Sequence, residues 1–219
     1  MATSGTFASS FPFDDLLTEA WERIGKSPAI LNASVAESAR RSLQLVLISW
    51  TNESAPLWQI IPTTLTLASG VSTVTLPAQF ADVLDIYVTW NATDYILGRV
   101  GRSDYNSYSN KAITGRPTQV WLERQLAAPV LHLYPVPDQV YTATAYCLRQ
   151  PQDVGGMSQT MDAPFLWGEA LCSALAARLA EKFAPDRLNE KVALAVDAFK
   201  KAKGESRERV SLRIAPDLY

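Results

Sequence analysis

The hydrophobic pattern of this chain changes its period twice, and that change limits the possible folds more than any other feature. Near the N-terminus, apolar residues recur at the spacing of one helix face: Phe13, Leu16, Leu17, Ala20, Trp21 and Ile24. From Pro56 to about residue 150 the pattern alternates and is rich in β-branched and aromatic residues, as in strands. After Gly156 the helical spacing returns. The sequence therefore predicts an α+β fold, in which a helical bundle built from both chain ends carries an inserted antiparallel β module.

A second N-terminal helix is expected to open at Ser34, because Glu37 follows three residues later and the pair matches a capping box. Its expected buried face carries apolar residues at helical spacing: Ala36, Ala39, Leu43, Val46, Leu47 and Trp50. Leu45 and Ile48 widen this apolar face beyond one stripe. The second helix is therefore expected to contact more than one neighbour.

Two more helices are expected after residue 160. Asp162 is the expected N-cap of the first, with Pro164 in its first turn. Its expected stripe consists of Leu166, Ala170, Leu171, Ala174, Leu175, Arg178, Leu179 and Phe183. Pro185 is expected to end this helix and start the next, which Gly204 closes. The expected buried side of the last helix consists of Leu188, Val192, Ala195, Phe199 and Ala202.

The middle of the chain contains short strand patterns separated by proline, glycine and asparagine. The expected strands are 57–67, 71–77, 83–90, 94–100, 118–124, 129–135 and 141–149. A short helix is expected between Ser103 and Asn110. Strands this closely spaced indicate an antiparallel sheet or sandwich, because parallel strands need longer crossover connections.

These patterns divide the chain into four segments. The expected segments are N-terminal helices in 1–55, a β-rich module in 56–150, C-terminal helices in 160–204 and an extended C-terminal arm in 205–219. The arm is expected to be extended because its apolar residues alternate: Val210, Leu212 and Ile214.

Charge and cysteine content exclude several classes of protein. The formal net charge of −2 argues against strong non-specific DNA binding, which needs a large positive field. Cys147 and Cys172 lie among apolar neighbours, which favours buried thiols in a reducing compartment over a disulfide. The first residues contain neither a basic nor an apolar leader region, and no apolar run is long enough to span a membrane. We therefore expect folding in the cytosol and no membrane contact.

Residues suited to catalysis or metal binding are few. His132 is the only histidine, and no serine or cysteine motif accompanies it. A zinc site made from His132 and the two distant cysteines is improbable. Nucleotide-binding glycine motifs are missing from the sequence. Asp82, Asp85 and Asp94 could form a carboxylate pair for glycoside hydrolysis, but carboxylates at strand faces and turns are common. We predict no catalytic, cofactor-binding or metal-binding residues.

The chain contains six tryptophans and eight tyrosines, which raises a second hypothesis. Aromatic side chains on a β domain can bind sugars or a protein partner, so the protein could be a carbohydrate-binding or cell-wall-acting protein. Trp21, Trp50 and Trp167 fall on expected helix core faces. The β region then retains Trp58, Trp90 and Trp121, which are more often half-buried core residues than a binding platform.

Five segments together resemble the head-to-tail adaptor proteins of short-tailed bacteriophages, also called connectors or tail accessory factors. They are FDDLLTEAWERIG (13–25), ARRSLQLVLISWTNESAPLWQI (39–60), SDYNSYSNK with GRPTQVWLER (103–124), LHLYPVPD (131–138) and DAPFLWGEALCSALAARLAEKFAP (162–185). Each segment is weakly specific alone, and their order and spacing carry the resemblance.

The resemblance implies structural work in the virion neck, after assembly in the host cytoplasm. Adaptors of this kind form a ring, usually dodecameric, beneath the portal protein; they extend the DNA channel and carry the downstream tail or nozzle protein. A ring closes through head-to-tail contacts between unlike surfaces. The near-neutral charge suits a channel through which genomic DNA passes without sequence-specific binding. A tail terminator or other neck protein remains a third hypothesis.

By the same resemblance, the C-terminal arm reaches the portal. The expected portal-binding residues combine cationic and alternating apolar side chains: Arg207, Arg209, Val210, Leu212, Arg213, Ile214 and Tyr219. Such a segment can add to a partner sheet or fill pockets, while its arginines pair with carboxylates. The alternative is that the arm folds back on its own subunit.

Overall fold

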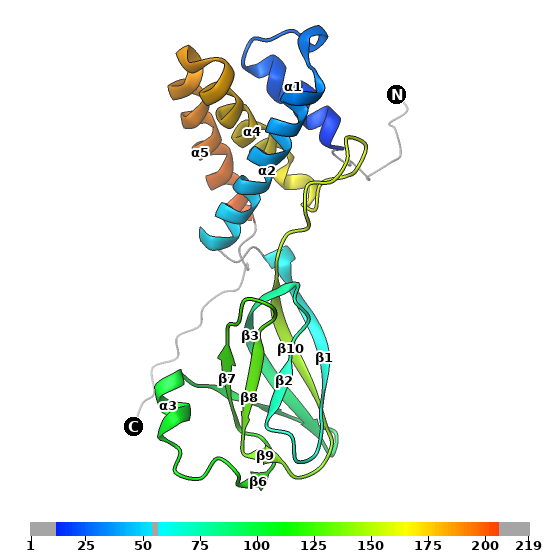
Figure 1. The fold of residues 1–219 in the computed structure, drawn as a ribbon, viewed down its shortest axis with the longest axis vertical. Helices are drawn as coiled ribbons and strands as arrows, with labels where there is room; N and C mark the ends of the chain where they lie inside the picture. Colours follow the sequence, from blue (N-terminus) through cyan, green and yellow to red (C-terminus); the bar gives the residue numbers. More distant parts are fainter. Residues whose placement is uncertain (1–11, 54–56, 206–219) are drawn as a thin grey trace, which may run out of the picture. The chain divides into compact units, whose positions relative to one another are not determined.

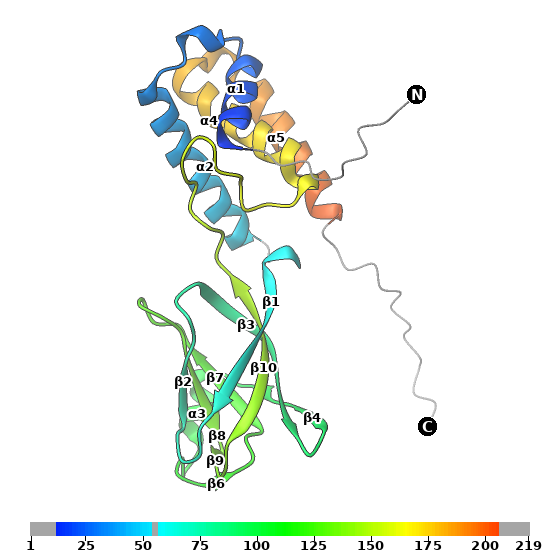
Figure 2. The same cartoon turned by 90° about the vertical axis from the view of Figure 1, so that its right-hand side faces the viewer.

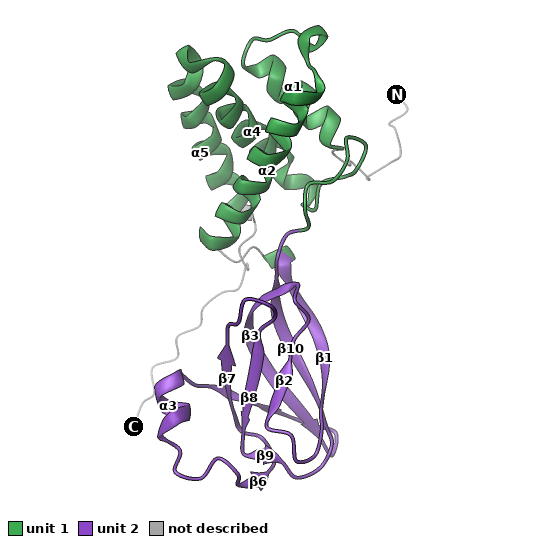
Figure 3. Cartoon of the chain, viewed as in Figure 1, with its two compact units in different colours: residues 1–58, 152–219 green, residues 59–151 purple. Residues whose placement is uncertain are grey.

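The computed structural model describes residues 12–53 and 57–205. It consists of two compact units, coloured separately in Figure 3. The helical unit takes residues 1–58 and 152–219 from the two chain ends, and the β unit takes residues 59–151. The predicted α+β fold, with helices at both ends and a β module in the middle, is confirmed.

The described part of the helical unit contains four helices: α1 (Phe13–Arg23), α2 (Ala33–Glu53), α4 (Gly168–Phe183) and α5 (Leu188–Glu205). Single 3₁₀ turns precede three of them, namely η1 (Pro28–Ile30), η3 (Phe165–Trp167) and η4 (Pro185–Arg187). A fourth turn, η2 (Leu57–Gln59), precedes the first strand. Helix α4 is central and packs against α1, α2 and α5, as Figures 1 and 2 show from two sides. The segments before and after the β insertion are therefore parts of one bundle.

The core of the helical unit follows the predicted helix faces. Phe13, Leu17 and Trp21 of α1 pack with Leu43 and Leu47 of α2 in one buried cluster. The central helix contributes both large and small buried residues to it: Leu171, Cys172, Leu175, Ala176, Leu179 and Ala180. Alanines let neighbouring helices approach closely, which explains how α4 can be covered on several sides at once.

Two helix starts differ from the sequence prediction. Helix α2 begins at Ala33, and the Oδ1 atom of Asn32 accepts a hydrogen bond of 3.1 Å from the amide of Val35, so Asn32 is the N-cap. The predicted capping box, with Ser34 as the first residue of the helix, was therefore wrong. The Glu37 carboxylate instead pairs with Arg40 one turn later, at 3.1 Å.

The C-terminal helices also depart from the predicted limits. Asp162 does not cap α4, because that helix begins at Gly168 after η3. The Oδ2 atom of Asp162 instead accepts a hydrogen bond of 2.8 Å from the amide of Gln152. Leu166 belongs to η3 and is 63% exposed, so its place on the buried stripe was wrong. Gly204 does not close the last helix either, because α5 continues to Glu205.

Two four-stranded sheets form the β unit (Figure 1). The first has the order β1 (Ile60–Leu67), β10 (Tyr141–Arg149), β3 (Phe80–Trp90) and β4 (Thr93–Ile96). The second has the order β2 (Thr73–Thr75), β8 (Val130–Tyr134), β7 (Gln119–Glu123) and β5 (Gly98–Arg99). Alternate residues of both sheets share one core, including Val88 and Ala145 from the first and Val120 and Leu131 from the second. This arrangement is a sandwich.

Smaller features complete the β unit. The short helix α3 (Arg102–Ser107) confirms the helix expected in this region. The pairs β5–β7 and β6 (Thr114–Gly115) with β9 (Val136–Pro137) run parallel, whereas the longer pairs are antiparallel as predicted. Leu57 and Trp58, expected in the first strand, form the turn η2 instead.

Candidate interaction site

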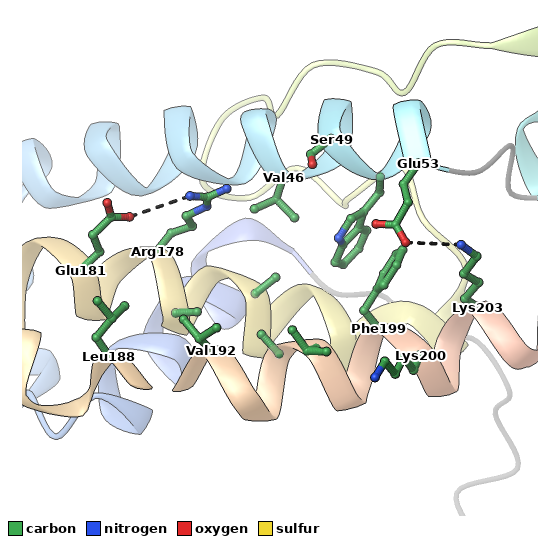
Figure 4. A pocket seen from close by; sticks show the side chains of 15 residues that line it. Val46, Ser49, Glu53, Arg178, Glu181, Leu188, Val192, Phe199, Lys200 and Lys203 are labelled. Carbon is green, nitrogen blue, oxygen red and sulfur yellow. Dashed lines mark hydrogen bonds and ion pairs between the residues drawn. The ribbon is translucent and has the colours of Figure 1, made fainter. Parts of the chain in front are cut away.

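A groove runs along the helical unit between α2, α4 and α5 (Figure 4). Its volume is about 650 Å³, within the range of sites that bind apolar ligands or side chains. The apolar lining residues are Val46, Trp50, Ala174, Ala177, Leu188, Val192, Ala195, Val196 and Phe199. The charged or polar ones are Ser49, Glu53, Arg178, Glu181, Lys200 and Lys203.

The composition of α5 explains why the groove is open. From Val192 to Phe199 the helix reads VALAVDAF, with one charged residue, so its apolar surface is wider than one neighbour can cover. Phe199 is buried, but Val192 is 44% and Val196 is 47% exposed. The prediction that Val192 is buried was therefore wrong. Its helical spacing is right, and no described residue covers it.

Aromatic side chains pack together at the end of the groove near Phe199. Trp50 of α2 stacks on Phe199 of α5, with ring centroids 5.0 Å apart and an interplanar angle of 27°. Trp167 of η3 meets the Phe199 ring edge-on at 5.9 Å. Trp58 of η2 contacts Trp167 at 6.4 Å. This cluster fixes the end of α5 against η3 and α2 with geometries that aromatic rings favour.

Ion pairs mark both ends of the groove in Figure 4. At one end Glu53 of α2 pairs with Lys203 of α5 at 3.3 Å, and at the other Arg178 and Glu181 of α4 lie 3.8 Å apart. Lys200 also lines the rim and makes no ion pair with any described residue. The rim therefore has three basic and two acidic side chains around an apolar floor.

A second exposed apolar surface lies where η3 meets α1, and we call it the η3 surface. Its residues line a pocket of about 630 Å³, at whose floor Leu16, Gly168 and Cys172 are buried. The full set is Asp15, Leu16, Glu19, Arg23, Phe165, Leu166, Gly168, Glu169 and Cys172. Phe165 is 57% and Leu166 is 63% exposed. Three carboxylates and one guanidinium surround these two side chains. The η3 surface is therefore apolar with an acidic margin.

Hydrogen bonds hold the charges of the η3 surface in place. The Arg23 guanidinium donates to both carboxylate oxygens of Glu169, at 2.6 and 2.8 Å, and to Glu19 at 2.8 Å. The hydrogen bond to Glu169 raises the pKa of Arg23, and the same bond lowers the pKa of Glu169. Both groups are therefore charged at neutral pH.

Two of the three carboxylates considered for hydrolysis have structural partners in the β unit. Asp82 accepts hydrogen bonds from Arg99 at 2.7 Å and from Arg124 at 2.5 Å. Asp94 accepts one from the Thr89 hydroxyl at 2.7 Å, and Asp85 is exposed. Asp82 is held between two arginines, so both of its carboxylate oxygens are engaged in structural ion pairs.

The β-unit aromatic residues are packed against one another. The Trp121 ring stacks on His132 at 4.5 Å and contacts Tyr105 at 5.4 Å. A hydrogen bond with His132, 2.9 Å long, lowers the pKa of the Glu123 carboxyl. The ring of Trp121 is thus used in packing, which weakens the carbohydrate hypothesis at this residue. Trp90, 39% exposed, is more open to solvent than Trp121.

Comparison with known protein families shows to which family the chain belongs. Residues 11–216 match the family described as SU10 adaptor protein. The chain belongs to this family. The resemblance to phage head-to-tail adaptors is confirmed at the level of the family, and the protein is a bacteriophage adaptor with a structural role. A search among curated proteins finds no match.

Burial limits the reactivity of the two cysteines of this adaptor. Both cysteines are free thiols, and burial raises the pKa of Cys147 to about 11 and that of Cys172 to about 12. No group of side chains suited to metal binding occurs among residues 12–53 and 57–205. Within the same ranges, no helix has the length and apolar content needed to cross a membrane.

Every residue of the predicted portal-binding arm of the adaptor lies outside the described residues: Arg207, Arg209, Val210, Leu212, Arg213, Ile214 and Tyr219. The groove and the η3 surface were not predicted. A signal for the groove was present in the sequence, because VALAVDAF in α5 has a single charged residue and an apolar surface wider than one stripe. The exposure of Phe165 and Leu166 depends on where α4 begins, which the sequence did not indicate.

Proposed function

We propose that the protein is one subunit of a dodecameric ring at the phage head-to-tail junction, between the portal and the tail. The ring extends the DNA channel and provides the platform to which a downstream tail or nozzle protein attaches. The observation that carries this proposal is the match to an adaptor family over nearly the whole chain, residues 11–216.

Two features of the helical unit support assembly. The groove and the η3 surface leave large apolar side chains open to solvent, among them Val192, Val196, Phe165 and Leu166. Contiguous exposed apolar surface of this kind marks sites of association. A subunit of a ring needs such surfaces, because each copy contacts two neighbours.

The arm, residues 205–219, is proposed as the portal-binding element. It follows directly on α5, which ends at Glu205, and so starts from a fixed point on the helical unit. Its alternating valine, leucine and isoleucine suit β-addition or insertion into pockets, and its arginines suit pairing with carboxylates.

The charge of the protein supports passage of DNA rather than binding. Lysine and arginine number 20 and aspartate and glutamate 22, so a ring carries no net positive charge. A ring without a positive field does not gain the counterion-release free energy that holds DNA to basic proteins. We place the ring in the virion neck, assembled in the host cytoplasm without membrane contact.

A portal-binding assay with a truncated chain tests the proposal. A variant ending at Glu205 should keep its circular dichroism spectrum and thermal unfolding but lose binding to purified portal, measured by co-sedimentation. A variant lacking residues 2–11 is the matched control for shortening a chain end and should bind like the full chain. Equal portal binding by both truncated forms contradicts the role of the arm.

A further inference from the structure

We propose that the groove between α2, α4 and α5 receives the η3 surface of the next copy of this chain, with Phe165 and Leu166 inserted into it. This inference rests on the proposed ring and names the two surfaces through which its subunits meet. It makes the subunit contact head-to-tail, because the groove and the η3 surface are different parts of one molecule.

The groove has the dimensions and chemistry for these two side chains. It offers about 650 Å³ lined by valine, leucine, alanine and aromatic residues. Phe165 and Leu166 are consecutive in a 3₁₀ turn and are both more than half exposed. Burying large apolar side chains such as these removes them from water and stabilises the contact. Insertion would also cover Val192 and Val196, the exposed residues of α5.

The charges around the two surfaces are complementary. The groove rim carries Arg178, Lys200 and Lys203 against two glutamates. The margin of the η3 surface carries Asp15, Glu19 and Glu169 against one arginine. A rim with an excess of basic groups and a margin with an excess of acidic groups attract each other, and they disfavour contacts of groove with groove.

Helix α4 separates the two surfaces, so the η3 surface of one molecule cannot enter the groove of the same molecule. Its groove residues Ala174, Ala177, Arg178 and Glu181 and its η3-surface residues Glu169 and Cys172 belong to different faces. At about 100° per residue, the centres of the two faces lie about 160° apart around the helix axis. Surfaces on opposite sides of one element join successive copies into a ring or a filament.

Cross-linking in the assembled complex tests this arrangement. Leu166→Cys and Val196→Cys are made separately, purified, mixed with portal and treated with a short bismaleimide. Cross-linked dimers are expected in the mixture of the two variants and absent from either variant alone. The native thiols give little background, because both are buried and have raised pKa values.

A charge exchange provides an independent measure. Lys200 and Asp15 make no ion pair with other described residues, so reversing either breaks no ion pair of the described subunit. Lys200→Glu and Asp15→Lys should each weaken ring assembly about ten-fold, and the double variant should recover most of the loss. Reversal of Asp85, exposed in the β unit, is the control and should leave assembly unchanged.

The outcomes separate this inference from the proposed function. A ring that forms on the portal without the Leu166–Val196 cross-link overturns the inference and leaves the adaptor role standing. Cross-linking of the Val196→Cys variant to itself means groove-to-groove contact and also overturns it. If residues 206–219 of the same chain, or the portal, protect the cysteine of the Val196→Cys variant from reaction, the inference is also overturned. Failure of the unmodified protein to form any ring contradicts both proposals.

Discussion

The guanidinium group of Arg23 on α1 and the carboxylate of Glu169 on α4 form a bidentate ion pair, with Nη1–Oε1 and Nη2–Oε2 distances of 2.6 and 2.8 Å. The two residues are 146 positions apart in the sequence. Arg23 also donates to the Ser173 hydroxyl at 3.0 Å. The pair thus joins the segment before the β insertion to the segment after it.

Replacing Arg23 should weaken the helical unit. Arg23→Ala is expected to lower the free energy of unfolding by about 1 kcal/mol, because the pair has ideal bidentate geometry but Glu169 is 64% exposed and screened by solvent. Arg178→Ala, which removes a looser pair within one helix, should cost only a few tenths of a kcal/mol. Urea denaturation of the two variants measures the difference. Equal losses would mean that the Arg23 pair adds nothing.

The same pair predicts a pH dependence. The pKa of Glu169 is lower in the folded protein than its ordinary value of 4.5, because Arg23 donates to it. A carboxyl with a lowered pKa contributes stability above its unfolded pKa and loses that contribution as pH falls through its folded pKa. Glu169→Gln should therefore destabilise the protein at pH 7 and make little difference well below pH 4. A constant difference across this range would contradict the assignment.

Asp82 should matter to the β unit far more than its neighbour Asp85. Asp82→Ala removes the partner of both Arg99 and Arg124 and is expected to cost about 2 kcal/mol of unfolding free energy. Asp85→Ala removes an exposed carboxylate on the same strand and should stay within about 0.5 kcal/mol. Thermal unfolding of both variants measures these costs. Similar costs would show that Asp82 has no special structural role.

Trp167 and Leu166 are adjacent in η3 but should differ sharply. Trp167 is 2% exposed and contacts Trp50 and Phe199, so Trp167→Ala is expected to cost about 4 kcal/mol. Leu166→Ala should leave subunit stability within about 0.5 kcal/mol and weaken ring assembly instead. The comparison uses urea denaturation of the subunit and sedimentation of the portal complex. Loss of subunit stability in Leu166→Ala would remove η3 as an interaction surface.

Strand limits were predictable where one chemical pattern dominated. Strand β10 was expected at 141–149 and occupies Tyr141–Arg149, because Tyr141, Ala143, Ala145 and Cys147 alternate with polar or larger residues. These four side chains are buried in the sandwich core. Residue alternation reports burial on one sheet face directly, so a single sequence suffices.

Helix starts depended on contacts that a sequence does not contain. Asn32 and Ser34 are both good N-cap residues. In the structure Asn32, which closely follows the turn η1, accepts the hydrogen bond from the Val35 amide in the first turn of α2. Asp162 has cap chemistry too, but the amide of Gln152 uses its carboxylate. Local propensity therefore identified the helices and misplaced two of their starts.

The interaction surfaces could not be predicted because burial is a property of neighbours. Val192 and Phe199 both fall on the expected buried side of α5, yet only Phe199 meets the rings of Trp50 and Trp167. Val192 faces the groove and is 44% exposed. The spacing of apolar residues shows which side of a helix requires cover and does not show whether the same chain supplies it.

The most direct test of the account is the mass of the protein measured alone and with purified portal by native mass spectrometry. We expect a complex in which a dodecamer of this chain is bound to the portal ring, and electron microscopy should show a closed ring. A protein that remains a single copy in the presence of portal would contradict the central claim that this chain acts through the surfaces it presents to its own copies and to the portal.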